Sequence, residues 1–114
     1  MKNNNRNRES GDGLNHIEPG SWNFSNDVVN VFDHHIKKSV PQYNSAHEII
    51  VKVSDFFLAD QDRCIEIGCS TGTLIKLVSE RHQKKNINFV GVDESANMIN
   101  FAKKNCKNNH FNFV

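Results

Sequence analysis

Apolar residues recur at helical spacing in two stretches of the chain before residue 60. In the first stretch, Val28, Phe32 and Ile36 lie four residues apart, which places them on one face of a helix. The residue before a proline is disfavoured in the α conformation, so this helix should end before Pro41. The pattern predicts one helix over residues 25–40.

The second stretch carries both a start signal and an apolar stripe. Ser45 is followed three residues later by Glu48, the spacing of a capping box, which predicts a helix that begins at Ser45. We expect this helix to end around residues 58–60. An apolar stripe predicts its inward face: Ile49, Ile50, Val53, Phe56 and Phe57.

The pattern then changes to short apolar runs that alternate with helical segments. Strands, helices and strands joined by short links are typical of parallel βαβ units, whose right-handed crossovers place both helices on one face of the sheet. The fold class is therefore α/β, a Rossmann-like βαβαβ unit preceded by two helices. The expected elements are a strand over 64–67, a helix from Thr73, a strand over 87–92, a helix over 96–105 capped by Ser95, and a strand from Phe111. The helical period in the first of these helices is carried by Leu74, Leu77 and Val78, and the expected inward face of the second is Met98, Ile99 and Ala102.

The beginning of the chain lacks such a pattern. Residues 1–27 hold seven Asn and only five apolar side chains, too few to repay the entropy of ordering. We therefore expect residues 1–24 to form a disordered lead and residues 25–114 to form the N-terminal half of a Rossmann-like domain.

Charge and cysteine content narrow the function classes. Fourteen basic and thirteen acidic side chains leave a net charge of +1, which disfavours nucleic acid or an anionic membrane as the main partner. The three cysteines form no C-x-x-C pair and the six histidines show no zinc-ligand spacing, so we expect no metal site. No apolar run is long enough for a membrane span and no signal peptide is recognisable, which predicts a cytoplasmic location.

The segment between the first strand and the following helix is the candidate binding loop. Glu66 ends the strand, and Gly68 and Gly72 bracket a turn of small residues before the helix begins. A glycine lets the backbone turn sharply and lets a ligand approach closely, and a helix N-terminus presents free N–H groups. In a doubly wound sheet, ligands bind at this end of the strands.

Two nucleotide ligands compete for this loop. The dinucleotide pattern G-x-G-x-x-G is matched at one glycine of three, because Ser70 and Thr73 replace the other two. Glu66 would also place a carboxylate near two phosphates. A ligand with a cationic end, such as S-adenosylmethionine, favours that carboxylate, and Asp93 lies 21 residues after Gly72, where it can accept both ribose hydroxyls.

These two segments resemble the motifs of the class I S-adenosylmethionine-dependent methyltransferases. Residues 66–72 look like the first motif with its middle glycine replaced, and residues 91–99 look like the second. Residues 32–43 followed by Gly68-Cys69-Ser70 are more narrowly similar to the carboxy-S-adenosylmethionine synthases of tRNA wobble-uridine modification. This chain departs from that branch at Gln42, usually glycine, at Glu66, usually Asp, and at Glu94, usually Asn.

The resemblance implies S-adenosyl-L-methionine as the cofactor, and it implies a set of cofactor-binding residues. It singles out no catalytic residue and no methyl acceptor, since a complete domain of the family continues through further strands that carry the acceptor pocket. We expect this chain alone to be inactive as an enzyme and to self-associate through exposed sheet edges. The main interpretation is the cofactor-binding half of a class I methyltransferase. The alternatives are a carboxy-S-adenosylmethionine synthase-like tRNA-modification enzyme and an inactive fragment or nucleoside-binding module. The candidate cofactor-binding residues are Tyr43, Glu66, Gly68, Cys69, Ser70, Gly72, Asp93 and Glu94.

Overall fold

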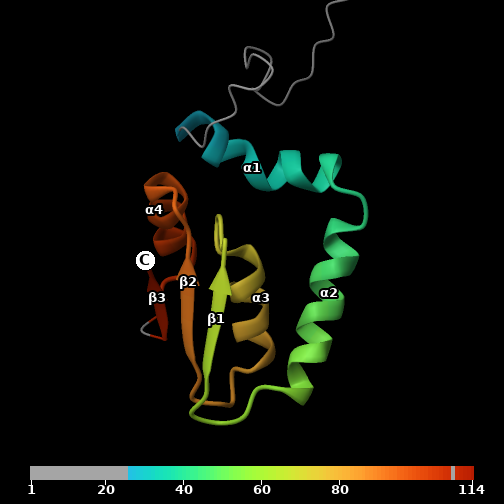
Figure 1. Cartoon of the computed structure of the whole chain (residues 1–114), viewed down its shortest axis with the longest axis vertical. Coiled ribbons are helices and arrows are strands. Elements are labelled where there is room, and N and C mark those ends of the chain that lie inside the picture. The colour runs from blue at the N-terminus through green and yellow to red at the C-terminus, as the bar shows by residue number, and fades with distance from the viewer. Residues whose placement is uncertain (1–25, 109) are drawn as a thin grey trace, which may run out of the picture.

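The computed structural model describes residues 26–108 and 110–114. The predicted disordered lead over residues 1–24 lies outside the described residues. Within them the predicted order of elements is confirmed: two helices precede a unit that alternates strand and helix (Figure 1). The elements are α1 (Asn26–Ser39), α2 (Tyr43–Val53), the short 3-10 helix η1 (Ser54–Phe56), β1 (Arg63–Ile67), α3 (Thr73–Arg81), β2 (Asn88–Val92), α4 (Ala96–Asn105) and β3 (Phe111–Phe113).

The strands form one parallel sheet in the order β1-β2-β3. Cys64 pairs with Phe89 and Phe89 with Phe111, so these three side chains share one face of the sheet. The buried core contains Ile75 from α3 and Ala102 from α4 together with Phe89. Both helices therefore cover the same face, as right-handed crossovers require.

Helix α4 follows the sequence prediction closely. The Ser95 side chain accepts a hydrogen bond from the Met98 N–H at 3.3 Å, which is an N-cap contact. The predicted inward residues Met98, Ile99 and Ala102 are the buried residues of this helix. Helix α3 differs slightly, because Ile75 and Val78 are buried whereas Leu77 of the predicted periodic set is exposed.

The prediction that Ser45 caps the second helix is wrong. Helix α2 begins two residues earlier, at Tyr43, and its N-cap residue Gln42 has a left-handed backbone (φ 61°) and no side-chain cap bond. The turn after Pro41 explains this start, because the Gln42 carbonyl already accepts the Ala46 N–H at 2.8 Å. Ser45 consequently lies inside the first turn. The helical segment also ends earlier than expected, at Phe56.

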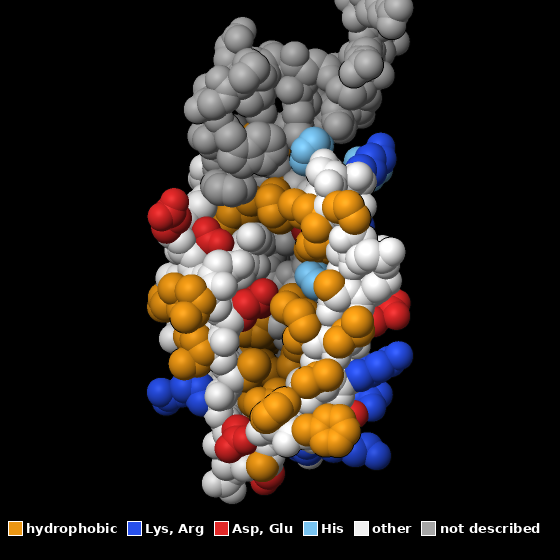
Figure 2. All heavy atoms as spheres, turned by 45° about the vertical axis from the view of Figure 1, so that its right-hand side comes forward, with side chains coloured by type: hydrophobic (Ala, Val, Ile, Leu, Met, Phe, Trp, Pro, Cys, Tyr) orange, Lys and Arg blue, Asp and Glu red, His pale blue; other side chains and the backbone are white. Residues whose placement is uncertain are grey.

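The apolar stripe of α2 is not an inward face. Phe56 is 86% exposed and Phe57 is 76% exposed, and the stripe residues Ile49, Ile50 and Val53 are exposed as well. The partly buried residues of α2 are instead Tyr43, His47 and Val51. Ile67 of β1, also 86% exposed, lies on the sheet face that α3 and α4 leave uncovered. Figure 2 shows apolar side chains gathered along this side of the molecule.

Helix α1 crosses above the carboxyl ends of the strands, next to the loop that follows β1 (Figure 1). Its Val28 and Val29 side chains are buried. No helix in the described part of the chain is both long and apolar enough to cross a membrane.

Candidate functional site

The loop between β1 and α3 is a tight turn held against the end of β2. Gly68, Ser70 and Gly72 all have positive φ angles, of 74°, 49° and 76°. The N–H groups of Gly68 and Cys69 both donate to the Val92 carbonyl, at 2.7 and 2.9 Å. The loop therefore has a defined shape that the neighbouring strand supports.

The two glycines predicted in this loop have different surroundings. A Cβ atom at Gly72 would lie 3.2 Å from the Ala102 Cβ and 3.3 Å from the Cys106 sulfur, so Gly72 allows α3 to pack closely on α4. A Cβ atom at Gly68 would meet no atom within 4 Å. Gly68 therefore leaves open space on the loop, as a ligand that approaches the backbone requires.

Asp93 joins the loop to the end of β2. One carboxylate oxygen accepts the Ser70 N–H at 2.9 Å, and the other accepts the Ser95 N–H at 2.9 Å. Each carboxylate oxygen has two acceptor positions, so both oxygens keep capacity for a further donor. The half-buried Asp93 thus connects the two motifs that the sequence indicated.

Glu66 lies at the other side of the loop, at the N-terminus of α3. Its carboxylate accepts the Ile75 N–H at 3.0 Å, which supplies the side-chain cap that Gly72 lacks. Burial raises the pKa of Glu66 to about 7, with the nearby Asp93 charge adding to the rise and the Ile75 N–H opposing it. Glu66 is therefore a partly buried acid whose charged form would gain from a cationic neighbour.

A cavity of about 240 Å³ lies between this loop, α1 and α2. Tyr43, the first residue of α2, is half-buried there, and its ring lies 4.2 Å from the His47 ring. Burial, together with the negative charges of Asp33 and Glu66, raises the pKa of Tyr43. The lining consists of Phe32, Ile36, Tyr43, His47, Glu66, Gly68, Cys69, Ser70, Thr71, Thr73 and Leu74.

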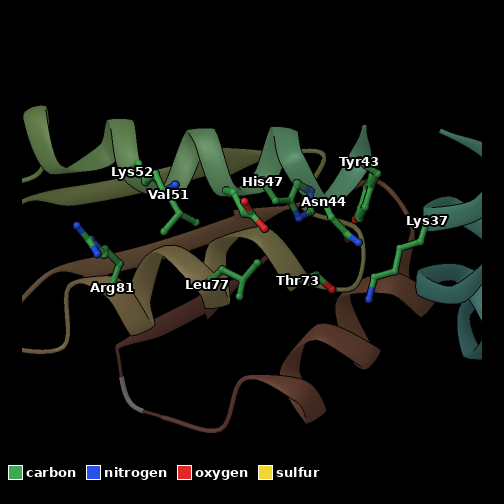
Figure 3. A pocket seen from close by; sticks show the side chains of 10 residues that line it. Lys37, Tyr43, Asn44, His47, Val51, Lys52, Thr73, Leu77 and Arg81 are labelled. Atoms are coloured by element: carbon green, nitrogen blue, oxygen red, sulfur yellow. The ribbon is translucent and has the colours of Figure 1, made fainter. Parts of the chain in front are cut away.

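A larger groove of about 650 Å³ runs from this cavity between α2 and α3. Tyr43, His47 and Thr73 line both spaces. Figure 3 shows Lys37 and Thr73 near one end of the groove and Arg81 at the other. The Arg81 guanidinium forms a salt bridge with the Asp55 carboxylate at 2.5 Å, which balances its positive charge.

The structure brings five of the eight predicted residues together around the smaller cavity, namely Tyr43, Glu66, Gly68, Cys69 and Ser70. Asp93 is connected to this group through Ser70, and Gly72 is buried beneath the loop. Glu94 is exposed and does not line the cavity.

The contacts of Cys69 indicate a structural role. Its side chain is buried, and burial together with the Glu66 and Asp93 charges raises its pKa to about 11, which keeps the thiol protonated. Its N–H is already bonded to Val92. These contacts agree with a space-filling role rather than a nucleophilic one. In the described part of the chain, no group of three His, Cys, Asp or Glu side chains could hold a metal ion.

Sequence reasoning missed four polar residues at this site: Asp33, His47, Thr71 and Thr73. The Asp33 carboxylate accepts hydrogen bonds from both threonine hydroxyls, at 2.7 Å from Thr71 and 3.2 Å from Thr73. The four-residue spacing of Tyr43 and His47 could have indicated their contact on one helix face. No local signal links Asp33 to a loop 38 residues further along the chain.

Comparison with known proteins identifies a family for this chain. Residues 58–114 match the family model described as a methyltransferase domain. This range contains the three strands, helices α3 and α4, and the loop between β1 and α3. A solved structure of the complex between the Haloferax volcanii Trm112 methyltransferase activator and a methyltransferase aligns with a TM-score of 0.55 at 16% identity. The alignment covers 78% of this chain and 37% of that chain. This likeness supports the Rossmann-like fold.

Curated relatives match most of the length of this chain. The carboxy-S-adenosyl-L-methionine synthase of Staphylococcus epidermidis is 33% identical over 97 residues, 84% of this chain and 42% of that protein. That of Nautilia profundicola is 35% identical over 86 residues, 75% of this chain and 36% of that protein. Carboxy-S-adenosyl-L-methionine synthase 1 of Yersinia pseudotuberculosis is 39% identical over 88 residues, 75% of this chain.

The chain spans between 34% and 42% of the length of these three relatives. The family model nevertheless matches from the end of the leading helices through β3, and it includes both motifs that Asp93 joins. The chain therefore belongs to the methyltransferase domain family.

Proposed function

We propose that this chain is the cofactor-binding part of a class I S-adenosyl-L-methionine-dependent methyltransferase. The observation that carries the proposal is the hydrogen bond from the Ser70 N–H to the Asp93 carboxylate. This bond places the turn after β1 beside the acid that ends β2, at the carboxyl edge where parallel sheets bind nucleotides.

The residues fit a nucleoside with a cationic amino-acid end. Glu66 is a partly buried carboxylate that lines the cavity, and an ammonium group would stabilise its charged form. A cavity of about 240 Å³ is smaller than the sites of whole drug-sized ligands, about 300–1,000 Å³. We therefore assign the amino-acid end to this cavity and the ribose to Asp93, across the open surface at Gly68.

The remaining predicted residues have narrower roles in this proposal. Tyr43 would form one wall beside the amino-acid end, and the Ser70 backbone would border the ligand. Gly72 and Cys69 would act through the loop, by allowing α3 to pack closely and by filling space below the turn. Glu94 follows Asp93 on the exposed side and would border the nucleoside there. S-adenosylmethionine supplies an activated methyl group, so the protein contributes mainly binding and orientation.

A nicotinamide dinucleotide fits this site less well. Ser70 stands where the dinucleotide motif has its second glycine, and its side chain lines the cavity. Glu66 would also lie close to a pyrophosphate, where two negative charges repel. These features favour a ligand without phosphates.

A second candidate is a carboxy-S-adenosylmethionine synthase-like function in tRNA modification. The position of Tyr43 favours it. Tyr43 ends the segment 32–43 that is similar to those synthases, and it lines the same cavity as the Gly68-Cys69-Ser70 turn of that resemblance. The named relatives support the same branch. The departures at Gln42, Glu66 and Glu94 stand against it.

Calorimetric titration of the chain with S-adenosylhomocysteine, and separately with NAD, tests the first proposal. We expect saturable binding of S-adenosylhomocysteine, no binding of NAD, and at least tenfold weaker S-adenosylhomocysteine binding in Asp93→Ala, since that change removes acceptors for two hydroxyls. Glu80→Ala, which removes an exposed acid on α3, is the matched control and should bind like the wild type. Binding of NAD alone, or equal affinities in Asp93→Ala and the wild type, would contradict the proposal.

A further inference from the structure

The side chain of Asp33 connects α1 to the binding loop. One oxygen accepts the Thr71 hydroxyl at 2.7 Å, and both oxygens lie 3.2 Å from the Thr73 hydroxyl. The two hydroxyls are themselves 3.1 Å apart. One carboxylate therefore bridges both threonines of the segment that leads into α3.

The partners of Asp33 are well placed for a strong contact. Thr71 is 1% exposed, and its carbonyl is also 3.5 Å from the Asn105 side-chain amide of α4. Thr73 begins α3, where the positive end of the helix favours a negative charge. Hydrogen bonds to a charged acceptor are stronger than those between neutral groups.

The neighbours of Asp33 on α1 form part of the cavity wall. Phe32 and Ile36 lie four residues apart on this helix, and both line the cavity of about 240 Å³. Helix α1 itself crosses above the carboxyl ends of the strands (Figure 1). Asp33 thus links the segment that leads into α3 to the helix that forms this wall.

We infer that Asp33 is a positioning residue for the cofactor: its bonds to Thr71 and Thr73 hold the loop and the α1 wall in the binding geometry. This inference rests on the proposed function for its ligand, but the contact that it concerns exists in the free chain. Asp33 does not contact the cofactor in this account, because its oxygens are directed at the threonine hydroxyls.

Two measurements on a small set of variants test the inference. The variants are Asp33→Ala, Thr71→Val and the double variant, with Thr71→Ser as the conservative change that keeps the hydroxyl and His34→Ala as the matched control on an exposed position of α1. Amide hydrogen exchange of residues 68–75 in the free chain reports on the loop, and calorimetry reports on S-adenosylhomocysteine affinity. Circular dichroism establishes which variants are folded.

We expect Asp33→Ala and Thr71→Val each to speed exchange in the loop and to weaken S-adenosylhomocysteine binding at least about tenfold, as the loss of the charge-assisted bond between Asp33 and Thr71 implies. The double variant should be little worse than Asp33→Ala alone, because that change already removes the bond to Thr71. Thr71→Ser and His34→Ala should bind like the wild type.

The outcomes separate this inference from the proposed function. Unchanged loop exchange in a folded Asp33→Ala chain overturns the inference whether or not any ligand binds, and so does faster exchange with undiminished affinity. If the wild type does not bind S-adenosylhomocysteine, both the proposed function and the positioning role for this cofactor are wrong. Faster loop exchange in Asp33→Ala would then still show that Asp33 holds the loop. Should Asp33→Ala not fold, Thr71→Val against Thr71→Ser decides the question alone.

Discussion

The carboxyl group of Glu66 has two roles. It accepts the Ile75 N–H of α3 and lines the cavity where we place the amino-acid end of the cofactor. Burial raises its pKa to about 7, so near neutral pH the free chain holds a mixture of protonated and charged forms. An ammonium ligand selects the charged form and releases a proton from the remainder.

This linkage predicts a pH-dependent affinity. Below the pKa of about 7 the carboxyl must lose a proton before it can favour the cation, so S-adenosylhomocysteine affinity should rise about tenfold between pH 6 and pH 8. Glu66→Gln still accepts the Ile75 N–H but does not titrate, so its affinity should be lower at pH 8 and flat across this range. Calorimetry at several pH values measures both slopes, and parallel slopes in the two proteins would refute the assignment.

Gln42 is a second residue whose conformation leads to a prediction. Its φ angle of 61° is left-handed, which costs a non-glycine residue about 1–2 kcal/mol, and the resembled branch usually has glycine here. Gln42→Gly should raise the free energy of unfolding by about 0.5–1 kcal/mol after the entropy cost of glycine is deducted.

The matched control for Gln42 lies three residues later. Ser45 is exposed in the first turn of α2, so Ser45→Gly should lower the free energy of unfolding by about 0.5–1 kcal/mol. Denaturant unfolding measures both changes. Equal destabilisation by the two glycines would show that Gln42 is not strained.

At the scale of the elements, His82 connects the end of α3 to η1. This buried side chain lies 2.8 Å from the Ser54 hydroxyl, and Asp55, Arg81 and Lys85 are the charged groups around it. Burial, followed by the Lys85 charge, lowers the pKa of His82 from 6.5. The native state therefore resists protonation that the unfolded chain accepts.

The lowered pKa of His82 determines how the free energy of unfolding changes with pH. Because the pKa in the folded state is depressed, the contribution of His82 is complete above pH 6.5 and is lost as pH falls below it. His82→Gln should lower the free energy of unfolding by about 1 kcal/mol at pH 7.5 and lose less stability between pH 7.5 and 5.5. His110→Gln, at an exposed position, is the control; wild-type and His82→Gln curves of equal slope would contradict the prediction.

The elements also show what local pattern can and cannot predict. The Ser95 cap and the inward face of α4 were predictable because the neighbours that decide them lie within one turn. The start of α2 was not, since the left-handed Gln42 overrides the capping signal of Ser45 and Glu48. The Asp33 bridge joins segments 38 residues apart, and no periodicity carries such information.

For the molecule as a whole, the uncovered apolar side is the dominant feature. Exposed aliphatic and aromatic side chains follow α2, η1 and the open face of β1 (Figure 2). β1 pairs only with β2 within the described sheet, so its other edge is open. Patches and edges of this kind favour association with other chains.

We therefore expect concentration-dependent self-association of the chain in sedimentation experiments. Ile67→Thr combined with Phe56→Ser should reduce association and change the free energy of unfolding by less than about 0.5 kcal/mol, since both side chains are 86% exposed. Ile75→Thr, at a residue 1% exposed, should instead cost about 2–4 kcal/mol. Undiminished association in the double variant would exclude this face as the contact.

The loop after β1 and the acid after β2 form one cofactor site in the function that we propose. Amide chemical shifts of the ¹⁵N-labelled chain during titration with S-adenosylhomocysteine test it most directly, because they locate the ligand residue by residue. We predict the largest shifts at residues 68–72 and 93–95, with a smaller change at Tyr43. Shifts confined to the groove between α2 and α3, or no shifts at saturating ligand, would contradict the account.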